Sequence, residues 1–263
     1  MQRPPLGAPT LDAFDVNSAY HRRVAVPTVL STAISPELSD EAITLFTPLG
    51  STEQHGPHLP LDTDTRIAVA VATGAAAELA ADGGDGRTAL APAIAYGASG
   101  EHQSFAGTIS IGTEVLGRLL VEYARSAIQW CRRIVIVNGH GGNIQGLVSA
   151  VRLLRSEGRD VAWWACAVEG GDAHAGHVET SLLLHISPDV VRREEVLAGN
   201  VAPLHELMAP MRAGGVAAVS AIGVLGDPTT ASSQDGARML ETMTRQCADA
   251  VRRWTPDADG RLV

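Results

Sequence analysis

Short apolar runs alternate along the chain with longer segments of helical periodicity. The clearest run is RIVIVNG, at 133–139, which is rich in β-branched residues and ends at a glycine. This is the pattern of a buried strand. Similar runs occupy 43–50, 89–97 and 160–168. We predict that these four runs are strands buried on both faces, as in a parallel sheet.

The segments that follow these runs have the pattern of helices. Within 114–131, apolar residues recur every three or four positions, at Val115, Leu116, Leu119, Leu120, Tyr123, Ala127 and Ile128. Further helices are predicted over 66–82, 144–158, 177–186 and 234–254. Strand–helix alternation of this kind predicts an α/β fold, with a mainly parallel sheet covered by helices on both faces.

The chain of 263 residues suits one large α/β domain. Its start, MQRPPLGAPTLDAFD, is proline-rich and aperiodic, so we expect a flexible N-terminal extension over residues 1–20. We expect residues 21–263 to form a single domain, because no repeat or linker divides them. Hydrophobic residues make up 45% of the chain and aromatic residues only 4%, so the core should be aliphatic.

Charge and cysteine usage exclude several classes of function. A formal net charge of −9 argues against a nucleic-acid-binding surface. The sequence has no run of 18 apolar residues, so we expect no membrane insertion. The three cysteines, Cys131, Cys166 and Cys247, are widely spaced without a CxxC pair. They are typical of buried thiols in a reducing cytosol, and we expect a cytoplasmic protein.

Polar residues with metal-ligand chemistry follow each predicted strand. In chain order they are Glu53, His55, His58, Asp62 and Asp64; then Ser99, Glu101 and His102; then His140; and finally His174, His177 and Glu179. The carboxyl ends of parallel strands meet at one edge of a sheet, where ligands bind. Six of the nine histidines of the chain should therefore gather there.

Carboxylate oxygen and neutral imidazole are the ligands that Zn²⁺, Mn²⁺ or Fe²⁺ accept. Glu53 and His55 are two residues apart, so in extended backbone they point to one side, and Asp62 and Asp64 should do likewise. A carboxylate from the second pair could bridge two metals. A pair of metals can activate water and polarise a carbonyl, which suits amide hydrolysis. One of the two aspartates could instead cap the following helix.

Other interpretations of these loops exist. The segment NGHGGN, at 138–143, could be a phosphate-binding turn, but it lacks the spacing of a P-loop or a dinucleotide site. A non-catalytic, metal-stabilised binding protein would need a closed set of ligands. His177 could be only a surface residue near a helix start, and His102 could make loop hydrogen bonds in place of a substrate contact.

Four segments, GSTEQHGPHLPLDTDT, SGEHQSFAGTISI, NGHGGN and HAGHVETS, in this order resemble the creatininase (creatinine amidohydrolase) family. The resemblance covers about residues 27–254 and is strongest to the mycofactocin-system peptidases of that family. It implies a three-layer α/β/α fold and a homo-oligomer, often a hexamer. It also implies two divalent metals: one held by Glu53, Asp64 and His140, the other by His55, Asp64 and Glu179. By the same resemblance His174 is the proton donor. We expect the other polar residues of these loops to contact substrate or to support the ligands: His58, Ser99, Glu101, His102 and His177.

Two departures from creatininases bear on the substrate. Creatininases carry Glu two residues after the histidine of the NGH motif, where this chain has Gly142. They also carry Trp four residues before the proton donor, where this chain has Gly170. Both departures favour a substrate larger than creatinine. The resemblance therefore implies a peptidase that releases the modified C-terminal dipeptide of a small precursor peptide. The alternative is an amidohydrolase acting on a small cyclic or linear amide.

Overall fold

The computed structural model describes residues 27–39, 42–82 and 87–263. Its centre is a five-stranded sheet in the order β1-β3-β2-β4-β5, and every neighbouring pair is parallel. The strands are β1 (Thr28–Val29), β2 (Thr44–Leu49), β3 (Thr88–Leu90), β4 (Arg133–Asn138) and β5 (Val161–Ala165). The predicted mainly parallel sheet is confirmed.

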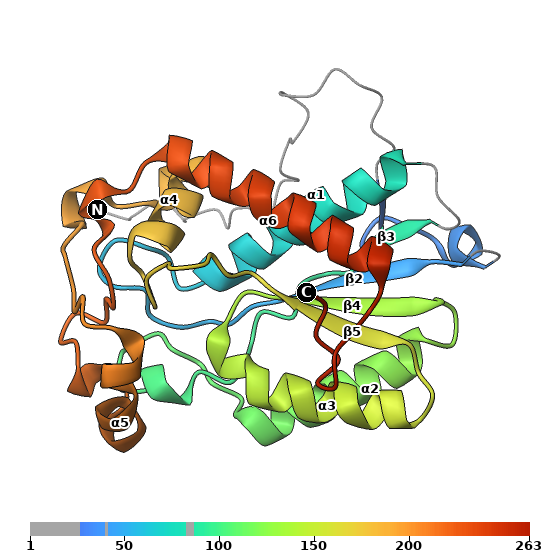
Figure 1. Ribbon diagram of the computed structural model, residues 1–263, viewed down its shortest axis with the longest axis horizontal. Coiled ribbons are helices and arrows are strands. Elements are labelled where there is room, and N and C mark those ends of the chain that lie inside the picture. The colour runs from blue at the N-terminus through green and yellow to red at the C-terminus, as the bar shows by residue number, and fades with distance from the viewer. Residues whose placement is uncertain (1–26, 40–41, 83–86) are drawn as a thin grey trace, which may run out of the picture.

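Helices cover both faces of this sheet (Figure 1). The α-helices are α1 (Thr63–Ala81), α2 (Thr113–Ala127), α3 (Ile144–Ser156), α4 (His177–Ile186), α5 (Leu204–Gly214) and α6 (Ser233–Arg253). Helices α1, α4 and α6 pack on one face, and α2 and α3 on the other. Short 3-10 helices lie at η1 (Ser35–Leu38), η2 (Gly100–His102), η3 (Gly141–Asn143), η4 (Pro188–Val190), η5 (Arg193–Glu195), η6 (Val216–Ala218) and η7 (Pro228–Thr230).

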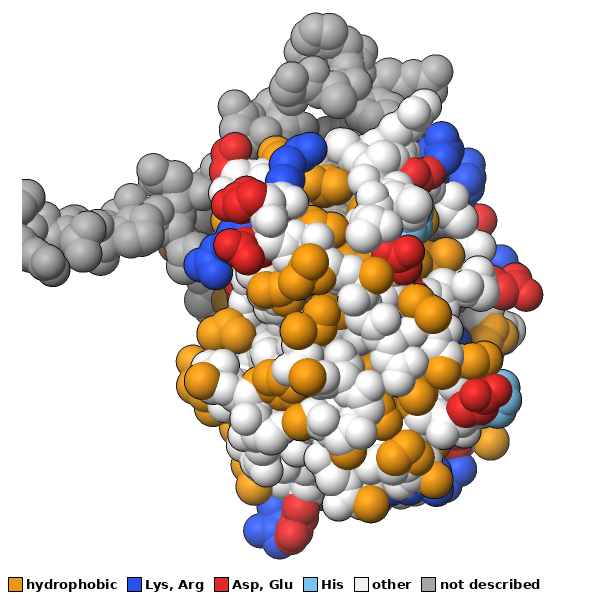
Figure 2. Space-filling model, turned by 90° about the vertical axis from the view of Figure 1, so that its left-hand side faces the viewer, with side chains coloured by type: hydrophobic (Ala, Val, Ile, Leu, Met, Phe, Trp, Pro, Cys, Tyr) orange, Lys and Arg blue, Asp and Glu red, His pale blue; other side chains and the backbone are white. Residues whose placement is uncertain are grey.

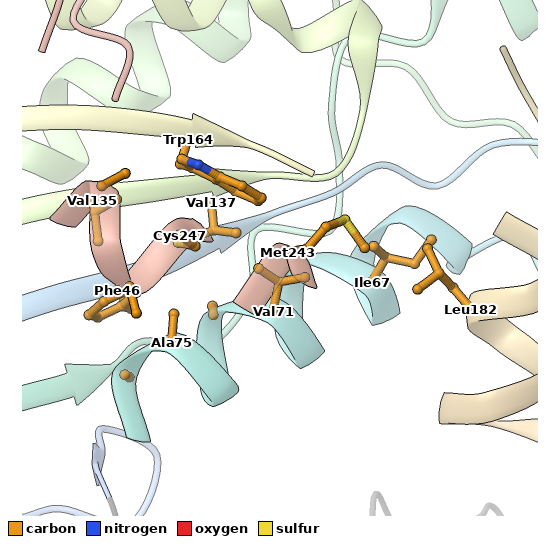
Figure 3. Packing of buried hydrophobic residues seen from close by; sticks show 14 of the residues in the cluster. Phe46, Ile67, Val71, Ala75, Val135, Val137, Trp164, Leu182, Met243 and Cys247 are labelled. Carbon is orange, nitrogen blue, oxygen red and sulfur yellow. The ribbon is translucent and has the colours of Figure 1, made fainter. Parts of the chain in front are cut away.

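Side chains on the two faces of the central strands pack into two separate hydrophobic cores. In β4, Val135 and Val137 join the core under α1, α4 and α6, whereas Ile134 and Ile136 join the core under α2 and α3. This follows from the two-residue period of a strand. Figure 3 shows the first core, in which Val137 lies among side chains from α1 and α6. Because both faces are buried, β4 reads as one continuous apolar run.

The predicted elements agree with the structure except at particular boundaries. Helix α1 begins at Thr63, three residues before the predicted start, so Asp64 lies in its first turn. Strand β3 is Thr88–Leu90, so it shares only Ala89 and Leu90 with the predicted 89–97 run. The two-residue β1 and the helix α5 were not predicted. The expected extension over 1–20, with its boundary at residue 21, lies outside the described residues.

None of the helices in the described ranges is both long and apolar enough to cross a bilayer. Cys131, Cys166 and Cys247 are all unpaired. Cys131 and Cys247 are buried as predicted, whereas Cys166 is only partly buried.

Helix α6 approaches α4 closely at Gly236, and this contact generates a stability prediction. A Cβ at Gly236 would lie 1.9 Å from the Ser181 carbonyl oxygen, which is backbone and cannot rotate away. We expect Gly236→Ala to lower the free energy of unfolding by roughly 1–3 kcal/mol, the usual cost of overpacking. Urea denaturation of both proteins measures the difference.

Gly117 in α2 is the matched control. A Cβ there would meet no atom nearer than the Gly146 carbonyl oxygen at 3.5 Å, an ordinary contact. Gly117→Ala should therefore raise stability slightly, by up to about 1 kcal/mol, because alanine favours a helix. Equal effects of the two substitutions would contradict the close contact between α4 and α6.

Candidate metal centre

The loops that follow the strands bring their imidazoles together at the carboxyl edge of the sheet. Five histidines from these loops are buried: His55, His58, His102, His140 and His174. Figure 2 views the molecule from the side of these loops, where little histidine surface is visible and apolar side chains are common. The cluster therefore lies beneath the surface of the protein.

One group of potential ligands consists of Glu53, Asp64 and His140. A ligand atom of each lies within 4.8 Å of the others. Glu53 Oε2 is 3.1 Å from His140 Nε2, and Asp64 Oδ2 is 3.5 Å from His140 Nδ1. These residues come from the loop after β2, the first turn of α1 and the loop after β4. The group could hold a metal ion.

A second group consists of His55, Asp64 and Glu179, and its ligand atoms meet the same distance limit. His55 Nε2 lies 3.1 Å from Asp64 Oδ1 and 3.8 Å from Glu179 Oε2. Glu179 is held in the first turn of α4, where its Oε2 accepts a hydrogen bond of 2.6 Å from the Ala175 backbone. Asp172 accepts from the Val178 backbone and so fixes the start of this helix.

Asp64 belongs to both groups and turns a different oxygen to each: Oδ1 to His55 and Oδ2 to His140. Asp62 does not join it, so the expectation that the two aspartates point to one side is wrong. The reason is that α1 begins at Thr63, which ends the extended backbone. Asp62 is 45% exposed and pairs with Arg66 at 2.8 Å, whereas the side chain of Asp64 is 2% exposed.

The carboxylates of this cluster favour positive charge on the neighbouring imidazoles. Burial lowers the pKa of His55, but the carboxylates of Asp64, Glu179 and Glu53 outweigh burial and raise that pKa to about 10. Burial likewise opposes a charge on His140, yet Glu53, Glu101 and Asp64 raise its pKa to about 9. Each of the two groups of potential ligands thus contains one imidazole with a raised pKa: His140 in the first group and His55 in the second. Both groups therefore favour positive charge among their carboxylates, which is the charge that a divalent metal ion brings.

The carboxylates of the cluster also favour a nearby positive charge, because burial makes their negative charge costly. Burial raises the pKa of Glu53 to about 7, and His140 and His55 only partly offset it. Burial also raises the pKa of Glu179 to about 7 against the opposing effect of His55. Within the described residues, Glu53 Oε1 is one of three buried side-chain atoms that receive no well-aligned hydrogen bond, although His102 Nε2 lies 3.2 Å and His174 Nδ1 3.8 Å from it. A buried carboxylate oxygen that faces several imidazoles in this way suits a metal ligand.

His174 lies beside both groups. Its Nε2 is 2.8 Å from the Gln54 carbonyl oxygen, to which it donates in the tautomer that carries the proton on Nε2. Its Nδ1 then turns an unprotonated face toward Glu53 Oε1, 3.8 Å away. Burial, together with His55 and His102, holds the pKa of His174 well below its ordinary value. His174 also forms a third possible donor group with Glu53 and His55.

Gln54 and Thr180 are site residues that the sequence reasoning missed. The two amide hydrogens of Gln54 reach His102 Nδ1 at 2.8 Å and the Gly223 carbonyl at 3.1 Å. Because Nδ1 of His102 accepts, its Nε2 carries the proton and lies 3.2 Å from Glu53 Oε1. Thr180 contacts His58 Nε2 at 2.8 Å, which joins the loop after β2 to α4. The sequence did offer one indication of a role for Gln54, because it lies between Glu53 and His55, which were both predicted to be metal ligands.

The remaining predicted site residues divide into two sets. Glu101 Oε1 lies 3.5 Å from His140 Nε2, and the buried Ser99 hydroxyl is, among the described residues, a second side-chain atom without a partner. His58 is buried, and burial and His55 lower its pKa to about 4. His177 lies apart: its imidazole contacts Thr230 at 3.0 Å and Asp235 at 3.9 Å, on the outer side of α4.

Comparisons with known proteins agree with this arrangement. Residues 31–251 match the sequence profile of the creatininase family, described as creatinine amidohydrolase. The mycofactocin precursor peptide peptidase of Mycolicibacterium smegmatis is 58% identical over 248 residues, which cover 94% of this chain and 100% of that protein. The chain therefore belongs to the creatininase family, a family of hydrolases, as its motifs indicated.

Solved creatininases share the fold. A structure named "Creatininase Mn" superposes with a TM-score of 0.70 at 24% identity and covers 88% of this chain and 100% of its own. An E122Q creatininase of "Zn-Zn type" gives a TM-score of 0.71 at 24% identity, covering 89% and 100%. The names of these structures identify manganese and zinc as metals of those proteins.

The shared position of Asp64 generates a prediction about metal content. If Asp64 uses both oxygens, Asp64→Asn should lose metal, because an amide offers only one oxygen as a ligand. Asp62→Asn is the matched control. Because Asp62 is exposed and lies outside both groups, its substitution should change the metal content little. Metal analysis of the purified proteins measures the difference, and equal losses at both positions would show that Asp64 is not shared.

Proposed function

We propose that this member of the creatininase family is a binuclear metal-dependent peptidase that acts on the mycofactocin precursor peptide and releases its modified C-terminal dipeptide. The observation that carries the chemistry is the sharing of Asp64 between two groups of potential ligands, all of them buried except the partly buried Glu179. The substrate rests on the full-length relative of 58% identity that is named for it.

In this proposal Glu53, Asp64 and His140 hold one ion, and His55, Asp64 and Glu179 hold the other. Oxygen and imidazole donors accept zinc, iron or manganese. Two divalent ions, when bound, would activate water and polarise the carbonyl of the scissile amide. The chain itself must then hold the peptide across the centre and provide a proton for the departing amine.

His174 is the proposed proton donor. Its Nε2 is fixed by the Gln54 carbonyl, so Nδ1 faces the site and can carry a proton toward the leaving nitrogen. His174 is 7% exposed, so it lies beside the ligand groups with little competition from water. A positioned imidazole within reach of the leaving nitrogen is the usual general acid of such sites.

Access beside the β5–α4 loop favours a peptide over a small cyclic amide. Gly170 has no atom within 4 Å of the position of a Cβ, so this position opens the space that a tryptophan would fill. A pocket of about 390 Å³ lies against the same loop, but it is lined by His177, Met239 and their neighbours and by none of the proposed ligands. A larger substrate is therefore favoured by Gly170 and not by this pocket.

We further propose a homo-oligomer, with a hexamer favoured by the family, in the cytoplasm. Tyr96, Ile109 and Val115 are large apolar residues that are about half exposed, at 48%, 51% and 54%. Association between copies would remove such side chains from water. The three unpaired cysteines suit a reducing compartment.

Metal-loaded protein tests the substrate class directly. It should cleave a short peptide carrying the processed C-terminus of the precursor and leave creatinine essentially untouched. Mass spectrometry of the peptide products and a creatine assay follow the two reactions. Turnover of creatinine with an inert peptide would favour an amidohydrolase acting on a small cyclic amide.

A second experiment separates the proton donor from the ligands. His174→Ala should keep near-normal metal content and folding but lose roughly 10²-fold or more in turnover, the usual effect of removing a general acid. His140→Ala is the comparison, because loss of a proposed ligand should lower metal occupancy itself. If His174→Ala loses metal as His140→Ala does, His174 is a ligand of the third donor group.

A further inference from the structure

The side-chain amide of Gln54 is held in one orientation. Its Oε1 accepts a hydrogen bond of 2.9 Å from the Gly56 backbone N–H. A backbone N–H can only donate, so the atom that faces it is the amide oxygen, and the nitrogen lies at the other end of the amide. Gln54 is 5% exposed, and Gly223 packs so closely that a Cβ there would lie 1.9 Å from Oε1. The surrounding backbone therefore fixes this amide.

The fixed amide determines the tautomer of His102. The amide nitrogen of Gln54 lies 2.8 Å from His102 Nδ1 and 3.1 Å from the Gly223 carbonyl oxygen, and it donates one hydrogen to each. An imidazole nitrogen that accepts a hydrogen bond carries no proton, so the proton of His102 lies on Nε2. That nitrogen is 3.2 Å from Glu53 Oε1. His102 therefore presents an N–H, and not a lone pair, to a proposed metal ligand.

His55 has the opposite arrangement within the same cluster. Its Nδ1 lies 3.1 Å from the Glu53 carbonyl oxygen, which can only accept, so Nδ1 carries a proton. Its Nε2 is then the nitrogen that is left to bind a metal ion, beside Asp64 and Glu179. A histidine that binds metal usually donates its other N–H to a carbonyl or a carboxylate, as His55 does and His102 does not.

We propose that Gln54 is a positioning residue that keeps His102 out of the metal ligands and makes it a hydrogen-bond donor beside Glu53. A metal ion needs a lone pair, which a protonated Nε2 does not offer. Gln54 belongs to none of the ligand groups, so it acts through the imidazole that it orients. The proposal rests on the metal centre of the proposed function, whereas the tautomer of His102 follows from the hydrogen bonds alone.

The backbone of Gln54 orients a second imidazole. His174 Nε2 lies 2.8 Å from the Gln54 carbonyl oxygen and 3.0 Å from the Gln54 amide nitrogen. Both hydrogens of that amide nitrogen already have acceptors, so His174 Nε2 makes the shorter bond, in which it donates to the carbonyl. Gln54 thus leaves His102 with a proton toward Glu53 and His174 with a lone pair toward the same carboxylate, 3.8 Å away.

Nuclear magnetic resonance of the zinc-loaded protein with isotope-labelled histidine tests the proposal, because protonated and unprotonated ring nitrogens have different chemical shifts. We expect the wild type to carry the His102 proton on Nε2. Gln54→Glu keeps the size of the side chain but replaces the donor with an acceptor, so Nδ1 of His102 should then carry a proton. Metal content should stay near that of the wild type. Turnover of the precursor peptide, as kcat/KM, should fall roughly 10- to 100-fold, the usual effect of changing a residue that orients the groups around a metal.

Gly223→Ala tests the same contact without changing Gln54. Its Cβ would displace the amide, so the proton of His102 should no longer be confined to Nε2. Gly112→Ala is the matched control, because Gly112 has the same φ of +79° and no atom within 4 Å of the position of a Cβ. It carries a comparable backbone cost and should keep the wild-type tautomer and activity.

Three results would count against these roles. A wild type with the His102 proton on Nδ1, or an unchanged tautomer in both Gln54→Glu and Gly223→Ala, would overturn the proposal. Metal loss in step with activity in Gln54→Glu would assign Gln54 to the support of the ligands and overturn it as well. The tautomer is measured without substrate, so an inactive, metal-loaded wild type would overturn the proposed function while the resonance experiment still decides the role of Gln54.

Discussion

Compensation of buried negative charge is the constraint on which the site depends. Three carboxylates come together at the carboxyl edge of the sheet: Glu53 and Asp64 are buried, and the side chain of Glu179 is 19% exposed. Their mutual repulsion would be costly without nearby positive charge. The carboxylates raise the pKa values of His55 and His140, so both imidazoles can supply compensating positive charge. The same oxygen and nitrogen donors are the ligand set of a divalent metal ion.

The same loops are tied to one another so that the cluster keeps its shape. Asn143 donates to the Gly50 carbonyl at 3.0 Å and accepts from the Ala98 backbone at 2.8 Å, which joins the loops after β2, β3 and β4. Gln54 contacts His102, His174 and Gly223 and so links the loop after β2 to three other segments. Parallel strands bring the loops to one edge, and these amide side chains fix their relative positions. The geometry of the ligands therefore depends on residues that cannot themselves bind metal well.

Periodicity predicted much of this arrangement, because buried parallel strands and amphipathic helices have strong patterns. Strand β4 and helix α4 were found at or within a residue of their ends, and the strand ends located the loops that hold the site. Local patterns could not predict how Asp64 differs from Asp62, since that depends on where α1 begins. Nor could they separate His177 from the other histidines: a helix start brings Glu179 inward and turns His177 outward. The role of Gln54 was equally hidden, because it depends on contacts with residues up to 169 positions away in the chain.

Positions around the ligands show how one metal-binding arrangement can serve different substrates. Gly142 and Gly170 each stand where creatininases carry a large side chain, and neither belongs to the proposed ligand groups. Exchange at such positions changes the space and the charge that a substrate meets, while the buried cluster keeps its charge balance. The carboxylate of Glu101 enters the space beside Gly142, whereas the position of Gly170 stays open. In the proposed function, chemistry therefore belongs to the loop ends that surround Asp64, and specificity belongs to neighbouring positions such as Gly142 and Gly170.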